Sequence, residues 1–206
     1  MLKSKKVGLF LLAILVVTLI AVCALLYINR ANTHTLDVFD SIEPFTLEST
    51  TGETYHSDNG KIKLIAFILL NCPDGVCPMT MWDFSLLQDE LKQKGWFGEE
   101  VELLAITFDP ARDDLEALKE YSQYFNADPE GWHFLRGEEE EIAAIADQLR
   151  YVYAVREDGS AMHATTMYLL DAKHRIRAYH KMTTPTDEMD KESVLRDIEA
   201  LVKERK

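Results

Sequence analysis

Hydrophobic positions along the chain fall into nearly continuous runs and into helical repeats. Residues 7–28 form the longest run and contain no charged side chain. KIKLIAFILL (61–70) and VELLAITF (101–108) are shorter apolar runs, of the length typical of strands buried on both faces. Between these two runs, residues 79–94 repeat apolar side chains at helical spacing. The pattern predicts a β-α-β unit.

Turn residues and shorter patterns predict the remaining elements. We expect a hairpin over 44–57, helices over 109–125, 138–150 and 187–203, and a pair of strands over 164–170 and 174–182. Asp109 followed by Pro110 is typical of a helix start, with Asp109 as the N-cap. Strand, closely spaced cysteines, helix, strand and helix, then a strand pair and a final helix is the order of the thioredoxin fold. We therefore expect an α/β domain over 42–206, with a thioredoxin-like fold, an N-terminal hairpin and insertions.

The run at 7–28 is long enough to span a membrane as a helix. Its 22 residues would extend about 33 Å, against a hydrocarbon core of about 30 Å. Three lysines precede the run and only Arg30 follows it closely, which predicts residues 1–6 in the cytoplasm and the domain on the outer side of the cell membrane. A cleaved signal peptide is the alternative, but the run exceeds the usual apolar region and no small-x-small cleavage site follows it. We expect one uncleaved transmembrane helix, followed by a polar tether over 29–41.

Charge differs between the two ends of the chain. The 206 residues carry 35 acidic and 22 basic side chains, a formal net charge of −13. Residues 1–30 contain four of the basic side chains and no acidic one, so 31–206 has 18 basic and 35 acidic residues, a net charge of −17. A surface this acidic repels the phosphate backbone of nucleic acids. We therefore expect no nucleic-acid partner.

Three cysteines are present, and two of them lie close together in the sequence. Cys23 falls within the apolar run and is interpreted as a thiol buried in the membrane. Cys72 and Cys77 follow a predicted strand, at the sheet edge where open α/β folds place their sites. We interpret them as a functional pair, with a local structural disulfide as the alternative. Pro78 suits the first position of a helix, which would make Cys77 the N-cap and lower the pKa of its thiol.

From about residue 42 to residue 202 the chain resembles the Sco/SenC family. Members of this family are membrane-anchored copper chaperones with thioredoxin-like folds, which help to assemble the dinuclear copper site of cytochrome c oxidase. Four motifs carry the resemblance, in the order and at separations similar to those of the family. They are NCPDGVCPMT (71–80), FDPARDDLEALKEY (108–121), GWHFLRGEEEEI (131–142) and HATTMYLLD (163–171).

The resemblance implies a set of copper ligands. Cys72, Cys77 and His163 would be the three ligands, and Asp109 would match the aspartate of the family's Asp-Pro motif. Two thiolates and one imidazole suit Cu(I). The same set could also hold Cu(II) with an added oxygen ligand. A structural zinc site usually has a fourth protein ligand. The family has three residues between its cysteines, but this chain has four. We place the extra residue at Gly75, because glycine adopts a positive φ at little cost.

The function that the resemblance implies is copper delivery rather than enzymatic catalysis. The expected partners are a cytochrome c oxidase subunit or another copper-accepting protein, together with a thiol reductant. The alternative is an extracytoplasmic thiol–disulfide oxidoreductase in which Cys72 and Cys77 act as a redox pair on a partner's cysteines. Against it, the residues before the late strand are Ser160-Ala161-Met162-His163, without the proline that thioredoxins place there. Peroxiredoxin activity and a pure interaction module remain weaker alternatives.

Other residues near the motifs are interpreted as structural. Three methionines near the ligand positions are assigned to the core or to a helix surface: Met79, Met81 and Met162. The three tryptophans are assigned to packing: Trp82, Trp96 and Trp132. The five remaining histidines are assigned to solvated or capping positions: His34, His56, His133, His174 and His180.

Overall fold

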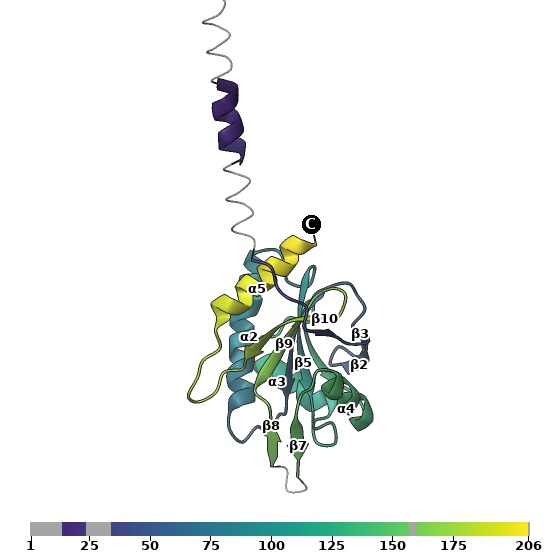
Figure 1. The fold of residues 1–206 in the computed structure, drawn as a ribbon. Helices are drawn as coiled ribbons and strands as arrows, with labels where there is room; N and C mark the ends of the chain where they lie inside the picture. The colour runs from purple at the N-terminus through teal and green to yellow at the C-terminus, as the bar shows by residue number, and fades with distance from the viewer. Residues whose placement is uncertain (1–13, 24–33, 157–159, 206) are drawn as a thin grey trace, which may run out of the picture. The chain divides into compact units, whose positions relative to one another are not determined.

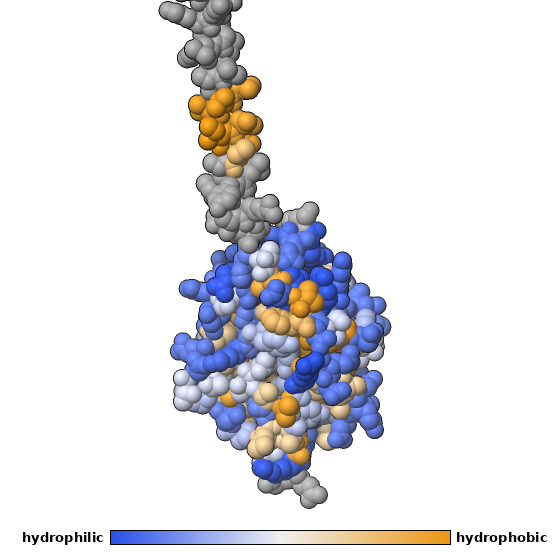
Figure 2. Space-filling model, in the orientation of Figure 1, coloured by the Kyte–Doolittle hydropathy of each residue, from blue (hydrophilic) through white to orange (hydrophobic). Residues whose placement is uncertain are grey.

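The computed structural model describes residues 14–23, 34–156 and 160–205. Its contacts divide the chain into two compact units, residues 1–35 and 36–206. In the first unit, residues 14–23 are helical, and their apolar side chains are exposed (Figure 2). The predicted membrane helix at 7–28 extends beyond the described residues on both sides, and residues 1–6 lie outside them. Within the part of the chain that is described, no helix is both long and apolar enough to cross a bilayer.

The second unit is built on a mixed sheet whose central strands are buried (Figure 1). Three strands run parallel: β4 (Ile62–Ile68), β5 (Val101–Thr107) and β6 (Trp132–Arg136). Strand β9 (Thr166–Leu170) pairs antiparallel with β4, and β10 (Arg175–Lys181) pairs antiparallel with β9. Every residue of β4 and β5 is buried, which confirms the prediction made from the two apolar runs.

Short strands complete the two edges of this sheet. At one edge β1 (Asp40–Ser41) pairs with β10. At the other edge β2 (Thr46–Ser49) pairs with β6 and forms a hairpin with β3 (Thr54–His56), so the predicted N-terminal hairpin is confirmed. A separate two-stranded sheet consists of β7 (Tyr153–Val155) and β8 (Ala161–His163). The sequence pattern did not predict β6, β7 or β8.

Four helices accompany the sheet in the second unit's described residues: α2 (Val76–Gln93), α3 (Leu115–Tyr124), α4 (Glu139–Gln148) and α5 (Lys191–Glu204). Helices α2 and α5 lie side by side (Figure 1), and an ion pair of 2.9 Å joins Asp83 of α2 to Lys191 of α5. The acidic start of α4 is confirmed, because Glu138 is the N-cap and forms a capping box with Glu141.

Local capping moves three helix starts away from the predicted positions. Helix α3 begins at Leu115 instead of Asp109, because the Asp114 carboxylate accepts the backbone N–H of Ala117 at 2.8 Å. Helix α5 begins at Lys191 rather than at residue 187, with Asp190 as its cap. Helix α2 begins at Val76, three residues before the predicted start. The prediction that Asp109 caps a helix is therefore wrong.

One buried carboxylate ties together the carboxyl ends of β4 and β5. Asp113 accepts the backbone N–H of Leu70 at 3.1 Å and the hydroxyl of Thr107 at 2.6 Å. Leu70 follows β4, and Thr107 is the last residue of β5. The carboxylate thus fixes the segment that enters the cysteine loop.

Replacement of Asp113 by Ala should destabilise the protein by about 2 kcal/mol, because it leaves a buried N–H and a buried hydroxyl without their acceptor. Urea unfolding followed by tryptophan fluorescence measures this loss. The exposed Asp58 provides the control, since Asp58→Ala removes the same charge without removing a buried acceptor. Equal stability of the two variants would contradict the role given to Asp113.

Candidate metal centre

The loop that carries the cysteine pair is shaped by a glycine at the start of α2. Gly75 is the N-cap of α2 and has φ 74°, and its N–H donates to the carbonyl oxygen of Cys72 at 3.4 Å. A left-handed N-cap strains a residue with a side chain, so the prediction that Gly75 takes a positive φ is confirmed. Because the helix begins at Val76, Cys77 is its second residue and Pro78 its third. The predictions of Cys77 as N-cap and Pro78 as first helical residue are wrong.

This helix start changes which thiol is acidic. The backbone N–H of Cys77 donates to Sγ of Cys72 at 3.3 Å. The hydrogen bond from the Cys77 thiol, together with contacts from His163 and this N–H, lowers the pKa of Cys72 to about 6, although burial and the hydrogen bond with the Asp74 carboxylate oppose the shift. The hydrogen bond between the two thiols and the burial of Cys77 raise the pKa of Cys77. The thiolate therefore forms first at Cys72. The sequence-based prediction that the more acidic thiol is that of Cys77 is wrong.

His163 approaches the pair from strand β8. Its side chain is only 2% exposed, and its ring lies 5.3 Å, between ring centroids, from that of Phe108. Nδ1 lies 3.0 Å from the carbonyl oxygen of Ala164, which can only accept, so Nδ1 carries the proton and donates it. Nε2 is buried and has no hydrogen-bond partner among the residues that the structure describes. The ring is thus fixed with its free nitrogen directed at the cysteines, the second-sphere arrangement common to metal-binding histidines.

The two cysteines and the histidine form one compact donor group. Sγ of Cys72, Sγ of Cys77 and a ring nitrogen of His163 all lie within 4.8 Å of one another. In residues 14–23, 34–156 and 160–205, no other group of three or more histidine, cysteine, aspartate or glutamate residues brings its ligand atoms this close together. Neither Cys72 nor Cys77 forms a disulfide in the structure. Two sulfur donors and an otherwise unpartnered imidazole nitrogen fit a soft, low-coordinate metal ion.

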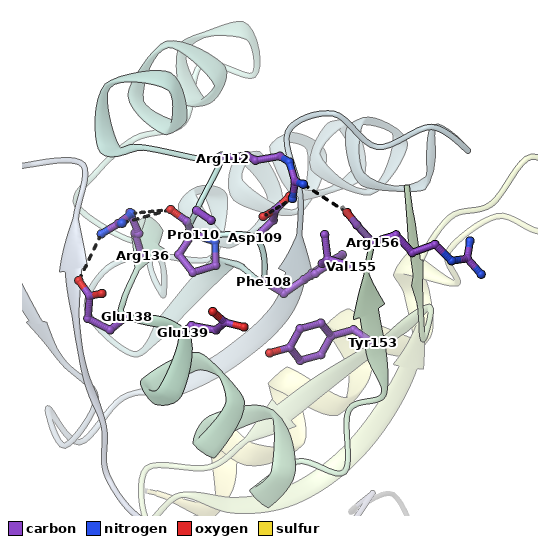
Figure 3. A pocket seen from close by; sticks show the side chains of 11 residues that line it. Phe108, Asp109, Pro110, Arg112, Arg136, Glu138, Glu139, Tyr153, Val155 and Arg156 are labelled. Atoms are coloured by element: carbon purple, nitrogen blue, oxygen red, sulfur yellow. Dashed lines mark hydrogen bonds and ion pairs between the residues drawn. The ribbon is translucent and has the colours of Figure 1, made fainter. Parts of the chain in front are cut away.

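Asp109 does not belong to this group, although it directly follows Phe108, whose ring contacts His163. Its carboxylate is bound by Nη1 of Arg112, at 3.1 Å to each oxygen, and Arg112 also donates to the carbonyl oxygen of Arg156 (Figure 3). These residues line a pocket of about 380 Å³, together with Phe108 and Tyr153. Phe108 contacts the His163 ring, so the pocket adjoins the donor group.

Several structural assignments made from the sequence need correction. Trp82 is 61% exposed on α2, so its assignment to packing is wrong, whereas Trp132 is buried in the core as expected. His174 is buried and its Nε2 lies 2.9 Å from the carbonyl oxygen of Ser57, so it is a core residue and not a solvated one. Met81 is fully buried, as assigned, and Met162 is exposed next to His163.

Asp74 is the residue that sequence reasoning missed. Its Oδ1 accepts from Sγ of Cys72 at 2.9 Å, and its Oδ2 lies 3.7 Å from Nε2 of His163. The available signal was its position between the two cysteines, because a side chain in so short a loop must lie near both of them.

Comparison with known proteins identifies the family. The SCO1/SenC family model matches residues 34–203. The chain belongs to the SCO1/SenC family. The SCO2-like protein RC0895 of Rickettsia conorii is 29% identical over 157 residues, which is 71% of this chain and 72% of that protein.

Solved structures of the family share this fold. A SCO1/SenC family lipoprotein from Bacillus anthracis superposes with a TM-score of 0.71 at 24% identity, over 82% of this chain and 99% of that one. The copper-bound ScoI of Arabidopsis thaliana gives a TM-score of 0.62 at 27% identity, over 76% of this chain and 97% of that one. The chain thus has the mixed α/β fold of the thioredoxin-like Sco structures.

Alkylation by iodoacetamide should distinguish the two thiols. In the metal-free, reduced protein we expect Cys72 to react with a pH midpoint of about 6, because only the thiolate attacks. Peptide mass spectrometry between pH 4.5 and 9 measures the rate at each cysteine. A Cys77→Ser variant keeps a hydroxyl donor next to Cys72 and is the matched control. A Cys72 midpoint near 9, or faster reaction at Cys77, would contradict the assignment.

Proposed function

We propose that this protein is a copper-binding metallochaperone that supplies copper during assembly of cytochrome c oxidase. The observation that carries the proposal is the convergence of Cys72, Cys77 and His163 within 4.8 Å. We assign these three residues as the copper ligands. Asp109 has a supporting role, because its ion pair with Arg112 holds the wall of the adjoining pocket.

Copper is the metal that this donor set favours. Thiolate and imidazole ligands in a three-coordinate set suit Cu(I) better than zinc, which would take a fourth protein ligand in a structural site. The Arabidopsis relative has been solved with copper bound. Family membership and donor chemistry therefore support the same ion.

Each ligand is prepared for metal binding by its own surroundings. The Cys72 thiol is mostly ionised near neutral pH, since its pKa is lowered to about 6. Cys77 gives up its proton when the metal binds, because a bound metal ion stabilises the thiolate. Contact with Cys72 raises the pKa of His163, so a proton at Nε2 competes with the metal for this nitrogen. Copper binding should release protons to solvent.

The recipient belongs to the respiratory chain in this proposal. Sco proteins are described as a family of cytochrome c oxidase assembly proteins. We propose a cytochrome c oxidase subunit or another copper-accepting protein as the partner, and a thiol reductant that keeps Cys72 and Cys77 reduced for loading. The net charge of −17 over residues 31–206 favours partners with cationic surfaces.

We propose that residues 7–28 anchor the protein in the cell membrane. The uncharged run in the sequence and the exposed apolar helix over residues 14–23 support this anchor. In this arrangement residues 1–6 lie in the cytoplasm, residues 29–41 form a tether, and residues 42–206 form the Sco/SenC domain outside. The preceding lysines support this orientation.

A thiol–disulfide oxidoreductase is the second candidate function. The observation that favours it is the asymmetry of the pair, since Cys72 is half-buried with a low pKa and Cys77 is fully buried with a raised one. Such a pair has one attacking thiolate and one protected resolving thiol. This function needs the two cysteines but not His163.

Replacement of His163 by Ala separates the two functions. We expect the Cu(I) affinity to fall at least about 100-fold, because even residues that only support a metal ligand are worth 10-fold to 100-fold. Competition titration with a chromophoric Cu(I) chelator under anaerobic conditions measures the affinity. The exposed His56 provides the matched control, and His56→Ala should leave the affinity unchanged.

The cysteine pair of the His163→Ala variant should still form a disulfide on oxidation. Unchanged Cu(I) affinity in this variant would contradict the assignment of His163 as a ligand. Retention of both thiol exchange and oxidase assembly in the His163→Ala variant would favour the oxidoreductase, because that function does not need His163.

A further inference from the structure

A groove lies along the exposed side of α2, on the residues that follow the cysteine pair. It encloses about 500 Å³ between α2, the end of α3 and the segment that joins β10 to α5, which runs beside α2 in Figure 1. Its α2 wall is apolar, because Met79, Trp82 and Leu86 follow one another at spacings of three and four residues and so share one face of the helix. Phe125, just after α3, extends this wall.

The groove offers apolar contact and no unsatisfied polar group at its base. Trp82 is 61% exposed and Leu86 is 38% exposed, and adjoining exposed side chains of this size are typical of interaction sites. The buried Asp83 carboxylate already accepts from the hydroxyl of Thr183 and from Nζ of Lys191, the latter at 2.9 Å. An occupant is therefore bound through its own bulky apolar side chain.

This groove reaches the cysteine loop. Pro78 lines it and directly follows Cys77. A Cβ atom placed on Gly75 would lie 3.8 Å from Cε of Met79, so the Met79 side chain lies against the loop at ordinary contact distance. A protein seated on Met79 and Trp82 would therefore have its neighbouring residues beside the metal ligands.

The charge around the groove selects the kind of occupant. The two segments that form most of its walls, residues 76–93 and 183–192, contain seven acidic and two basic residues, a net charge of −5. Both basic residues, Lys92 and Lys191, form ion pairs with aspartates. Glu188 lines the groove and is exposed. These walls attract a cationic segment and disfavour a second copy of this acidic domain.

We propose that the groove docks the copper-accepting partner, through a segment that carries a bulky apolar side chain next to Lys or Arg. The inference rests on the proposed copper-delivering function. The apolar side chain would pack on Trp82, and the cationic one would lie near Glu188 or over the Trp82 ring. The partner's own copper ligands would then approach Cys72, which is less buried than Cys77.

Docking of this kind permits transfer of Cu(I) by ligand exchange. Each copper–sulfur or copper–nitrogen bond that breaks on this protein is replaced by a bond to a donor of the partner. The released Cys77 thiolate takes up a proton from solvent, since its pKa is raised. No electron is transferred in this exchange, so the step needs no oxidant or reductant.

Binding of a copper-free oxidase domain tests the groove. The full chain is kept in solution with a mild detergent, and its partner in the test is the soluble domain of the cytochrome c oxidase subunit that carries the dinuclear copper site. Calorimetry of the metal-free proteins gives the Kd, and anaerobic mixing of the Cu(I)-loaded protein with the same domain gives the transfer rate. The variant is Trp82→Ala. Tyr179→Ala is the matched control, because Tyr179 is an aromatic residue on β10 that is 46% exposed and lies outside the groove.

The expected result is a Kd at least about tenfold weaker in Trp82→Ala, because an exposed tryptophan at an interface is commonly a hot spot. Copper transfer at limiting partner concentration should slow by a similar factor, while the Cu(I) affinity of the variant itself stays unchanged. Glu188→Lys is a second variant, and it should weaken binding and reduce the dependence of the Kd on salt. Tyr179→Ala should match the unsubstituted protein.

Four results would overturn the docking role while leaving the proposed function intact. They are no binding of the domain by the unsubstituted protein, an unchanged Kd in Trp82→Ala, an equal loss in Tyr179→Ala, and self-association of the unsubstituted protein that Trp82→Ala abolishes, which would assign the groove to a second copy. If the unsubstituted protein binds the domain through Trp82 but carries no copper, the proposed function fails and the docking surface stands.

Discussion

The start of helix α2 is the constraint on which the metal centre depends. Gly75 adopts a left-handed backbone conformation, and the helix can therefore begin at Val76, inside the cysteine loop. The N–H of Cys77 then reaches Sγ of Cys72, and the N–H of Val76 reaches the carboxylate of Asp74. Both groups carry negative charge when ionised, and the N-terminus of a helix stabilises negative charge. The left-handed Gly75 thus adds to the lowering of the Cys72 pKa, to which the Cys77 thiol contributes most, and ties the Asp74 side chain to the start of α2.

The histidine comes from a distant part of the chain, and two features bring it to the cysteines. Strand β8, which pairs with β7, places His163 at the site, where Phe108, directly after β5, packs against its ring. Asp113 joins the ends of β4 and β5, so the cysteine loop and Phe108 keep a fixed separation. The Ala164 carbonyl oxygen then fixes the ring with Nε2 free. Metal binding therefore requires little rearrangement, which lowers its entropic cost.

The sequence predicts the parts of this structure that depend on burial and misplaces those that depend on local hydrogen bonds. Strands β4 and β5 could be predicted because seven consecutive buried residues leave a continuous apolar run. The starts of α2, α3 and α5 could not, because competing caps such as Asp109 and Asp114 look alike in sequence. His163 was found through the family resemblance, since no local pattern links it to the cysteines 86 to 91 positions earlier. Asp74 was missed because its role depends on where its carboxylate points.

Copper K-edge X-ray absorption spectroscopy of the Cu(I)-loaded protein is the measurement that tests the central claim most directly. It counts the sulfur and nitrogen donors around the ion without relying on substitutions. The geometry of Cys72, Cys77 and His163 predicts two sulfur donors and one imidazole nitrogen at a single copper ion. A site with no nitrogen donor, or one in which copper is bound by a single sulfur, would contradict the account.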